Sequence, residues 1–140
     1  MGTVEMFEHT ADVGLRVRAD DLEDLFRSAA EGLFDYIVTN REEVREVVSE
    51  ELALRTDSTG QLLIDWLNEL IFRCETQHRL YRRFEVRLSR DGNELQATIL
   101  GEPIDQDRHR LDHEVKAVTH HGATLKKGAE SWEAELILDI

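Results

Sequence analysis

The sequence predicts an α/β (α+β) domain in which two helices pack on one face of a single mixed, mainly antiparallel sheet. Apolar residues recur at helical spacing in two stretches, residues 22–37 and 62–74. Most of the remaining chain alternates apolar and polar residues, which is the period of half-buried strands. With 140 residues and no internal repeat or linker, the chain is predicted to form one domain spanning residues 1–140.

The N-terminal part is expected to contain two strands and a helix. Residues 3–9 and 13–18 fit strands joined by a turn-like link at residues 10–12. Asp20 and Glu23 form a capping-box pattern, which predicts that the first helix starts there.

The middle of the chain is ambiguous before the second helix. Residues 41–57 fit either a helix or a strand, and their β-branched content favours a strand. Ser58 and Gln61 form a second capping box. The apolar face that follows is broad, which predicts a helix lying flat against a sheet.

The remaining chain is predicted to form strands at residues 84–88, 95–99, 115–120 and 132–140. Asp91-Gly92 is typical of a hairpin turn between the first two of these strands, because Gly adopts positive φ freely. Residues 121–131 are expected to form a loop before the last strand.

The charge of the chain restricts its partners. It has 17 Lys and Arg against 30 Asp and Glu, a net charge of -13 with His neutral. Such a surface repels phosphate backbones, so we expect no direct, tight binding to nucleic acid. It suits a partner with a basic surface, although solubility alone would also account for the acidity.

Composition also indicates a compartment. The single cysteine, Cys74, excludes an internal disulfide and favours a reducing environment. No apolar run is long enough to cross a membrane, and the first residues do not resemble a signal peptide. We therefore expect a cytoplasmic protein. The phosphate-binding loop, the dinucleotide fingerprint and the serine-hydrolase elbow are all missing, and we assign no catalytic residues.

Two groups of polar residues allow a functional and an ordinary interpretation. His109 and His113 have the four-residue spacing of a zinc-binding pair, but they lie in a non-periodic polar stretch, so we favour surface histidines. Asp65, Asn68 and Glu69 share one helix face, which is either a polar site or, more commonly, a solvated surface.

The end of the chain suggests a metal site. Asp139 and the terminal carboxylate of Ile140 are adjacent, and neighbouring carboxylates repel unless a cation bridges them. If Asp12 packs beside the last strand, three carboxylates converge. Hard divalent cations such as calcium require several oxygen ligands of this kind.

Five segments together resemble the archease family: EHTADVG (8–14), LLIDWLNEL (62–70), GE (101–102), EVKAVT (114–119) and LDI (138–140). They occur in the order and near the spacing of the family, over essentially the whole chain. The resemblance implies a small α/β fold. It also implies that the protein activates an RtcB-type RNA-splicing ligase in tRNA splicing and is not itself the catalyst.

The resemblance also implies site residues. The family's metal site corresponds to Asp12, Asp139 and Ile140, with calcium as the expected cation and manganese or magnesium as alternatives. Lys116 corresponds to a family lysine and is a functional candidate, unless it only neutralises the acidic cluster. Asp65 and Glu114 lie in matching segments and are candidates for contact with the ligase. His120 departs from the family's usual Tyr, and the Arg-rich stretch at 77–83 has no assignment.

Two other functions remain open at this point. A general chaperone or adaptor would use the acidic surface without specificity and would act on unrelated clients. A small metal-dependent hydrolase would use the carboxylates directly and would turn over a substrate without a partner.

Overall fold

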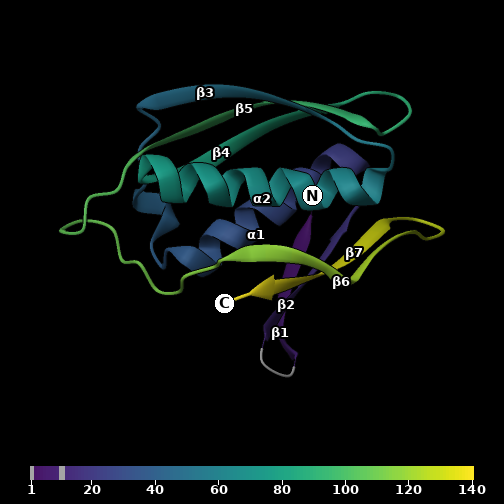
Figure 1. Cartoon of the computed structure of the whole chain (residues 1–140), viewed down its shortest axis with the longest axis horizontal. Coiled ribbons are helices and arrows are strands. Elements are labelled where there is room, and N and C mark those ends of the chain that lie inside the picture. Colours follow the sequence, from purple (N-terminus) through teal and green to yellow (C-terminus); the bar gives the residue numbers. More distant parts are fainter. Residues whose placement is uncertain (1, 10–11) are drawn as a thin grey trace.

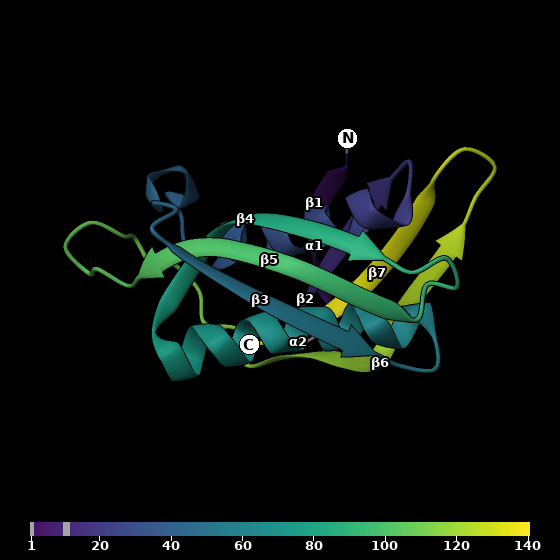
Figure 2. The same cartoon turned by 90° about the horizontal axis from the view of Figure 1, so that it is seen from above.

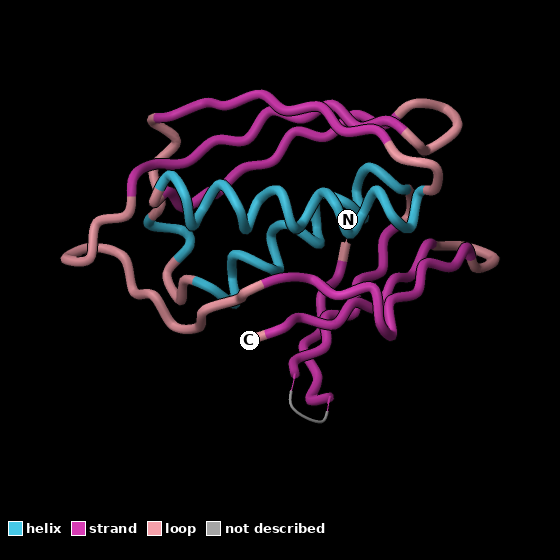
Figure 3. The backbone as a smooth tube through the Cα atoms, viewed as in Figure 1, coloured by secondary structure: helices cyan, strands magenta, loops and turns pink. Residues whose placement is uncertain are grey.

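The computed structural model describes residues 2–9 and 12–140 and has three layers. Two helices form the middle layer, between a four-stranded and a three-stranded sheet (Figure 1, Figure 3). The α+β class and the antiparallel pairing are therefore confirmed. The expected single sheet, with both helices on one face, is wrong. The helices contact strands of both sheets, because apolar side chains on opposite sides of each helix are buried.

The four-stranded sheet positions the end of the chain. Its strands, in spatial order, are β1 (Thr3–His9), β2 (Asp12–Ala19), β7 (Trp132–Asp139) and β6 (Ala117–Lys127). The last strand thus lies in the middle of the sheet, with Val13 of β2 opposite Leu138. The turn expected at residues 10–12 falls largely outside the described residues, and Asp12 itself belongs to β2.

The three-stranded sheet covers the helices from the other side (Figure 2). Its strands, in spatial order, are β3 (Val48–Arg55), β5 (Glu94–Pro103) and β4 (Arg79–Leu88). The strand interpretation of the ambiguous segment is confirmed for β3, which follows a short 3-10 turn at Arg41–Glu43.

β6 is longer than the sequence pattern predicted. Most of the loop expected at residues 121–131 is strand, because β6 continues to Lys127. Its pairing with β7 shifts register between Thr119 and Thr124, and Gly122 has a φ of 80°. A bulge inserts extra residues into one strand and breaks its alternation, so the strand's period was hidden in the sequence.

α1 (Leu22–Ile37) packs against β2 on one side and β4 on the other. Its N-cap is Asp21, not Asp20 as the capping-box pattern indicated. The carboxylate of Asp21 accepts a hydrogen bond from the backbone N–H of Asp24 at 2.8 Å. Such a cap stabilises a helix by about 1 kcal/mol.

α2 (Thr59–Gln77) starts at the predicted cap, where the Ser58 hydroxyl accepts from the Gln61 N–H at 3.2 Å. The two helices are tied together by Trp66, whose indole N–H donates to the backbone carbonyl of Phe26 at 3.0 Å. Because this N–H is hydrogen-bonded, the Trp66 ring is fully buried without leaving an unpaired polar group. Neither helix in the described part of the chain is long and apolar enough to cross a membrane.

A buried carboxylate holds the segment after β5 in place. Glu102 is 5% exposed and accepts hydrogen bonds from the Arg45 N–H at 2.6 Å, from Arg108 and from His109 at 2.9 Å. The other ring nitrogen of His109, Nδ1, accepts from the Asp105 N–H, so Nε2 is the donor to Glu102. Burial alone would raise the pKa of Glu102, but these bonds outweigh it and lower the pKa to about 2.

We expect Glu102→Gln to lower the free energy of unfolding at pH 7 by about 1.5–3 kcal/mol, the typical value of hydrogen bonds to a charged group. The folded pKa of about 2 lies below the ordinary 4.5, so the carboxylate stabilises the fold above pH 4.5. That stabilisation is lost as the pH falls from 4.5 towards 2. Urea denaturation should therefore show that the difference in free energy of unfolding between the unmodified protein and Glu102→Gln decreases as the pH falls across this range.

Glu94→Gln is the matched control, since Glu94 lies in the same strand with an exposed side chain. Surface changes of this kind alter stability by less than about 0.5 kcal/mol. A Glu102→Gln difference that stayed constant from pH 7 to pH 3 would contradict the stabilising role of the ionised carboxylate.

Candidate metal and partner site

The structure brings Asp12 and Asp139 together. Val13 is opposite Leu138, and continuing this antiparallel register by one residue places Asp12 opposite Asp139. Leu138 is fully buried against the helices, so its neighbour Asp139 lies on the outer face of the sheet. Directly opposite residues of an antiparallel pair have Cβ atoms about 4.5–5.5 Å apart on the same face. Asp12 and Asp139 therefore lie at neighbouring positions at the ends of β2 and β7.

An apolar patch adjoins this pair on the outer face. Ile137 is only 3% exposed although it points away from the helices. It lies opposite Gly14, where the Phe7 ring covers the backbone so closely that an added Cβ would be 2.1 Å from the ring. The Arg16 guanidinium lies 4.7 Å from the centre of the Phe7 ring. Gly14 is thus required for the close approach of Phe7 beside the acidic pair.

Asp12 and Asp139 make no ion pair with a cation among residues 2–7 and 12–140, the part of the chain whose side chains the structure describes. The same part holds no group of three His, Cys, Asp or Glu side chains arranged for a metal. A cation on this pair would need further oxygen ligands. We expect the carboxylate of Ile140, the neighbour of Asp139 in the sequence, to supply one of them. Hard divalent cations such as calcium, manganese and magnesium bind oxygen ligands of this type, whereas zinc and copper favour nitrogen and sulphur.

Lys116 is adjacent to the same strand end. Its backbone N–H donates to the carbonyl of Asp139 at 2.8 Å, and its side chain is exposed. Within the described residues its ammonium group makes no ion pair, so the structure does not show it neutralising the acidic pair.

The polar face of α2 is used for packing and is not simply solvated. The amide of Asn68 accepts from the Val118 N–H at 2.7 Å and donates to the Val118 carbonyl at 3.0 Å. β6 is an edge strand. The Asn68 side chain thus forms hydrogen bonds with the β6 backbone of the kind that another strand would form. Asp65 instead accepts from Gln61 at 2.7 Å, one helical turn earlier. Neither Asp65 nor Glu114 joins the Asp12–Asp139 pair in a metal-binding group.

Asn68→Ala should release the start of β6, because it leaves two backbone groups of Val118 without their partner. We expect a loss of about 1–3 kcal/mol in the free energy of unfolding. Amide hydrogen exchange at Val118 should accelerate, while exchange at Ala134 in β7 stays slow. Unchanged protection of Val118 in the variant would show that Asn68 does not hold this edge.

The histidines do not form a zinc pair. His109 is buried against Glu102, which corrects the expectation of a surface histidine. His113 is exposed and stacks on Tyr36, with ring centres 4.1 Å apart. Their spacing is helical, but the segment containing them is not a helix, so the two rings have separate partners.

A second network was not predicted from the sequence. Glu50 of β3 accepts from the Tyr81 hydroxyl at 2.6 Å and pairs with Arg79 and Arg73 at 2.8 and 3.1 Å. Arg73 also pairs with Glu69 at 2.8 Å. Burial and the adjacent carboxylate raise the pKa of Tyr81, so it remains a neutral donor. These ion pairs connect α2 to the three-stranded sheet. Arg79 belongs to the Arg-rich stretch at residues 77–83, so part of that stretch has a structural role.

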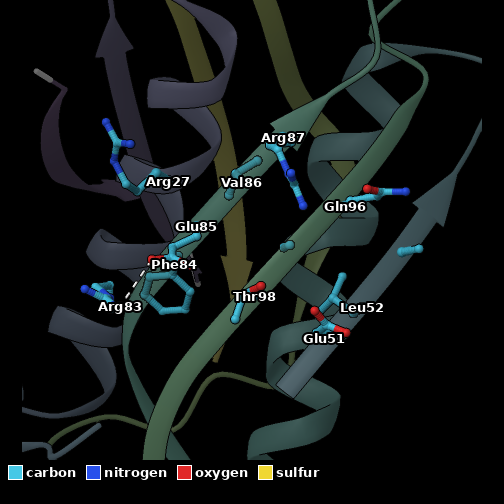
Figure 4. A pocket seen from close by; sticks show the side chains of 12 residues that line it. Arg27, Glu51, Leu52, Arg83, Phe84, Glu85, Val86, Arg87, Gln96 and Thr98 are labelled. Atoms are coloured by element: carbon cyan, nitrogen blue, oxygen red, sulfur yellow. Dashed lines mark ion pairs between the residues drawn. The ribbon is translucent and has the colours of Figure 1, made fainter. Parts of the chain in front are cut away.

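A hollow of about 910 Å³ lies on the three-stranded sheet, away from the candidate residues (Figure 4). Gln96 and Thr98 of β5 lie between Glu51 of β3 and the side chains of β4. Its charges are mixed: Arg27, Arg83 and Arg87 against Glu51 and Glu85, with Arg83 and Glu85 paired at 3.4 Å. Mixed, partly paired charge gives it no preference for a ligand of one sign.

The fold and the site together define a small α+β protein with acidic residues at the adjoining ends of β2 and β7. A sequence profile of the Archease protein family (MTH1598/TM1083) matches residues 4–140. The chain belongs to the archease family.

Relatives and solved structures agree with this assignment. The chain is 38% identical to Protein archease of Methanopyrus kandleri, over 97% of this chain and 98% of that one. It is 36% identical to Protein archease of Pyrococcus abyssi, over 97% of each.

Among solved structures, Protein 1598 of Methanobacterium thermoautotrophicum superimposes with a TM-score of 0.79 at 30% identity, over 98% of both chains. An archease of Thermotoga maritima, described as a possible chaperone, shares the fold with a TM-score of 0.64 at 19% identity, over 96% of this chain and 94% of that one.

Proposed function

We propose that the protein activates an RtcB-type RNA-splicing ligase in the cytoplasm during tRNA splicing, promoting guanylylation and multiple turnover of the ligase. The observation that carries the proposal is that Asp12 and Asp139 lie at the adjoining ends of β2 and β7 in an archease. Closely spaced carboxylates are suited to a divalent cation.

The proposed cation is held by Asp12, Asp139 and the carboxylate of Ile140. Calcium is expected, with manganese or magnesium as alternatives. When bound, it supplies positive charge that offsets the repulsion among the carboxylates. Each carboxylate offers two oxygen atoms, and ligand charge sets the affinity of such sites.

The chain's own residues then perform the docking. The outer face around Asp12 and Asp139 presents negative charge to a basic surface of the ligase, and Lys116 offers a single exposed cation beside it. Charge complementarity of this kind raises the association rate and fixes orientation. Activation follows if the protein binds one conformation of the ligase more tightly than another. Contacts with RNA remain with the ligase, in keeping with the net charge of -13.

A ligation assay tests the proposal. Ligase is held at low concentration with excess RNA ends, and joined product is measured with and without this protein. We expect product to exceed one turnover per ligase only when the protein is present, and RNA alone to be unchanged by it. Equal product in both reactions would reject the activator role.

A general chaperone is the second candidate, since the Thermotoga maritima archease is described as a possible chaperone. Refolding of an unrelated, aggregation-prone protein separates the two functions. An activator should leave refolding yield unchanged while increasing ligation. Turnover of an RNA or nucleotide substrate by this protein alone would instead support a metal-dependent hydrolase.

A further inference from the structure

An apolar groove of about 550 Å³ lies beside the candidate site, and we call it the α2 groove. It is formed by the C-terminal ends of α1 and α2 and by the segment of residues 104–115 between β5 and β6. In Figure 1 this segment runs from β5 past the end of α2 into β6. The apolar lining consists of Ile37, Ile71, Cys74, Leu80, Ile104 and Val115.

The rim of the α2 groove carries three acidic side chains and two histidines, His78 and His113, and His113 lies 3.2 Å from Asp112. Glu75, Asp112 and Glu114 line it, and all three are exposed. None of the residues lining the groove is a Lys or Arg, in contrast to the mixed charges on the three-stranded sheet. An acidic rim around an apolar floor is complementary to a cationic segment that carries a large apolar side chain.

An exposed leucine forms part of the same lining. Leu111 is 48% exposed although its backbone is fixed by pairing with Val38. A rigid backbone that holds a large apolar side chain in solvent leaves apolar area available for burial by a partner. A partner side chain can therefore contact Leu111 without any rearrangement of the Leu111 backbone.

The α2 groove is continuous with the acidic pair. Glu114 and Val115 line the groove, and the next residue, Lys116, donates its N–H to the carbonyl of Asp139. The groove and the proposed metal site are thus connected through the backbone of Lys116. A second copy of this chain fits poorly, because two surfaces of a protein with a net charge of -13 repel each other.

We propose that the α2 groove binds a cationic segment of the partner ligase, which inserts an apolar side chain between α2 and residues 104–115. The inference rests on the proposed function. It assigns Glu114 to partner recognition at the groove. The region of Asp12 and Asp139 supplies a second contact, outside the groove.

Binding of the purified ligase to the full-length protein is measured by calorimetry. Leu111→Ser removes the exposed apolar side chain, and Glu75→Lys reverses a rim charge. Each is expected to weaken binding at least about tenfold, and the double variant more. Val47→Ser and Glu130→Lys are matched controls, since Val47 is 68% exposed and neither residue lines the groove. The controls should bind within about twofold of the unmodified protein.

Calcium binding and thermal unfolding of each variant show whether the fold and the metal site are intact. If all five variants bind the ligase as tightly as the unmodified protein, and the unmodified protein activates ligation, the groove is not the docking site. If the unmodified protein neither binds nor activates the ligase, the proposed function fails and this inference fails with it. A dimer in sedimentation that Leu111→Ser dissociates would identify a second copy as the occupant and overturn the proposal.

Discussion

Asp12→Ala is expected to abolish activation of the ligase while leaving the fold intact. Loss of outer-shell partners of a metal already costs about 10- to 100-fold in affinity or activity. Removing a direct carboxylate ligand should therefore cost at least about 100-fold. The ligation assay under multiple-turnover conditions measures the effect. Calcium should also raise the midpoint of thermal unfolding of the unmodified protein but not of the variant, because only ligand binding to the folded state stabilises it.

The fold should tolerate this change because Asp12 lies on the outer face of β2, outside the core. Leu15 and Val17, which are fully buried, keep the strand in place. Asp20→Ala is a matched control: it removes the same charge just beyond the opposite end of the same strand. Loss of the circular dichroism spectrum together with activity in Asp12→Ala would assign Asp12 a structural role and remove it from the metal site.

Extension of the 140-residue chain beyond Ile140 should have an effect of similar size. Adding Gly-Ser converts the carboxylate of Ile140 into an amide, which carries one carbonyl oxygen and no charge. The added residues also occupy space beside Asp12 and Asp139. Affinity of a hard-cation site depends on ligand charge, so we expect calcium or manganese to bind at least about tenfold more weakly. Activation of the ligase should fall with it.

Two controls distinguish the effect of losing the Ile140 carboxylate from the effects of a changed side chain and of an added tag. Ile140→Val changes an exposed side chain but retains the carboxylate, and it should bind metal normally. Gly-Ser added before Met1 should also leave binding unchanged. The extended protein should unfold within about 0.5 kcal/mol of the original, as is usual for surface changes. Equal calorimetric affinity of all these forms would leave only Asp12 and Asp139 as ligands.

Local patterns in the sequence were sufficient for the elements that depend on neighbours along the chain. The two helices follow from apolar spacing, and the Ser58 cap from a short polar motif. Clean alternation identified the strand formed by residues 132–139. Patterns failed where long-range pairing decides. Gly122 and the register shift in β6 interrupt its alternation, so only its first part was expected to be a strand and residues 121–127 were expected to be a loop.

The candidate site divides in the same way. The sequence alone indicated Asp139 and Ile140, because adjacent carboxylates need no tertiary information to be recognised. It left Asp12 conditional on packing beside the last strand, and the β2–β7 register places its neighbour Val13 opposite Leu138. Asn68 looked like part of a solvated face, since helical spacing does not reveal that Val118 presents its backbone to that face.

The sequence by itself determined the α+β class, both helices, the acidic character and the residues that resemble archease, because each depends on composition or on short-range order. Only the tertiary structure decided that the strands form two sheets around the helices and that the ends of β2 and β7 bring two carboxylates side by side. It also decided that the ends of α1 and α2 and residues 104–115 form an apolar groove. These features arise from the burial of both sides of each helix, which joins segments far apart in the chain and leaves no local pattern.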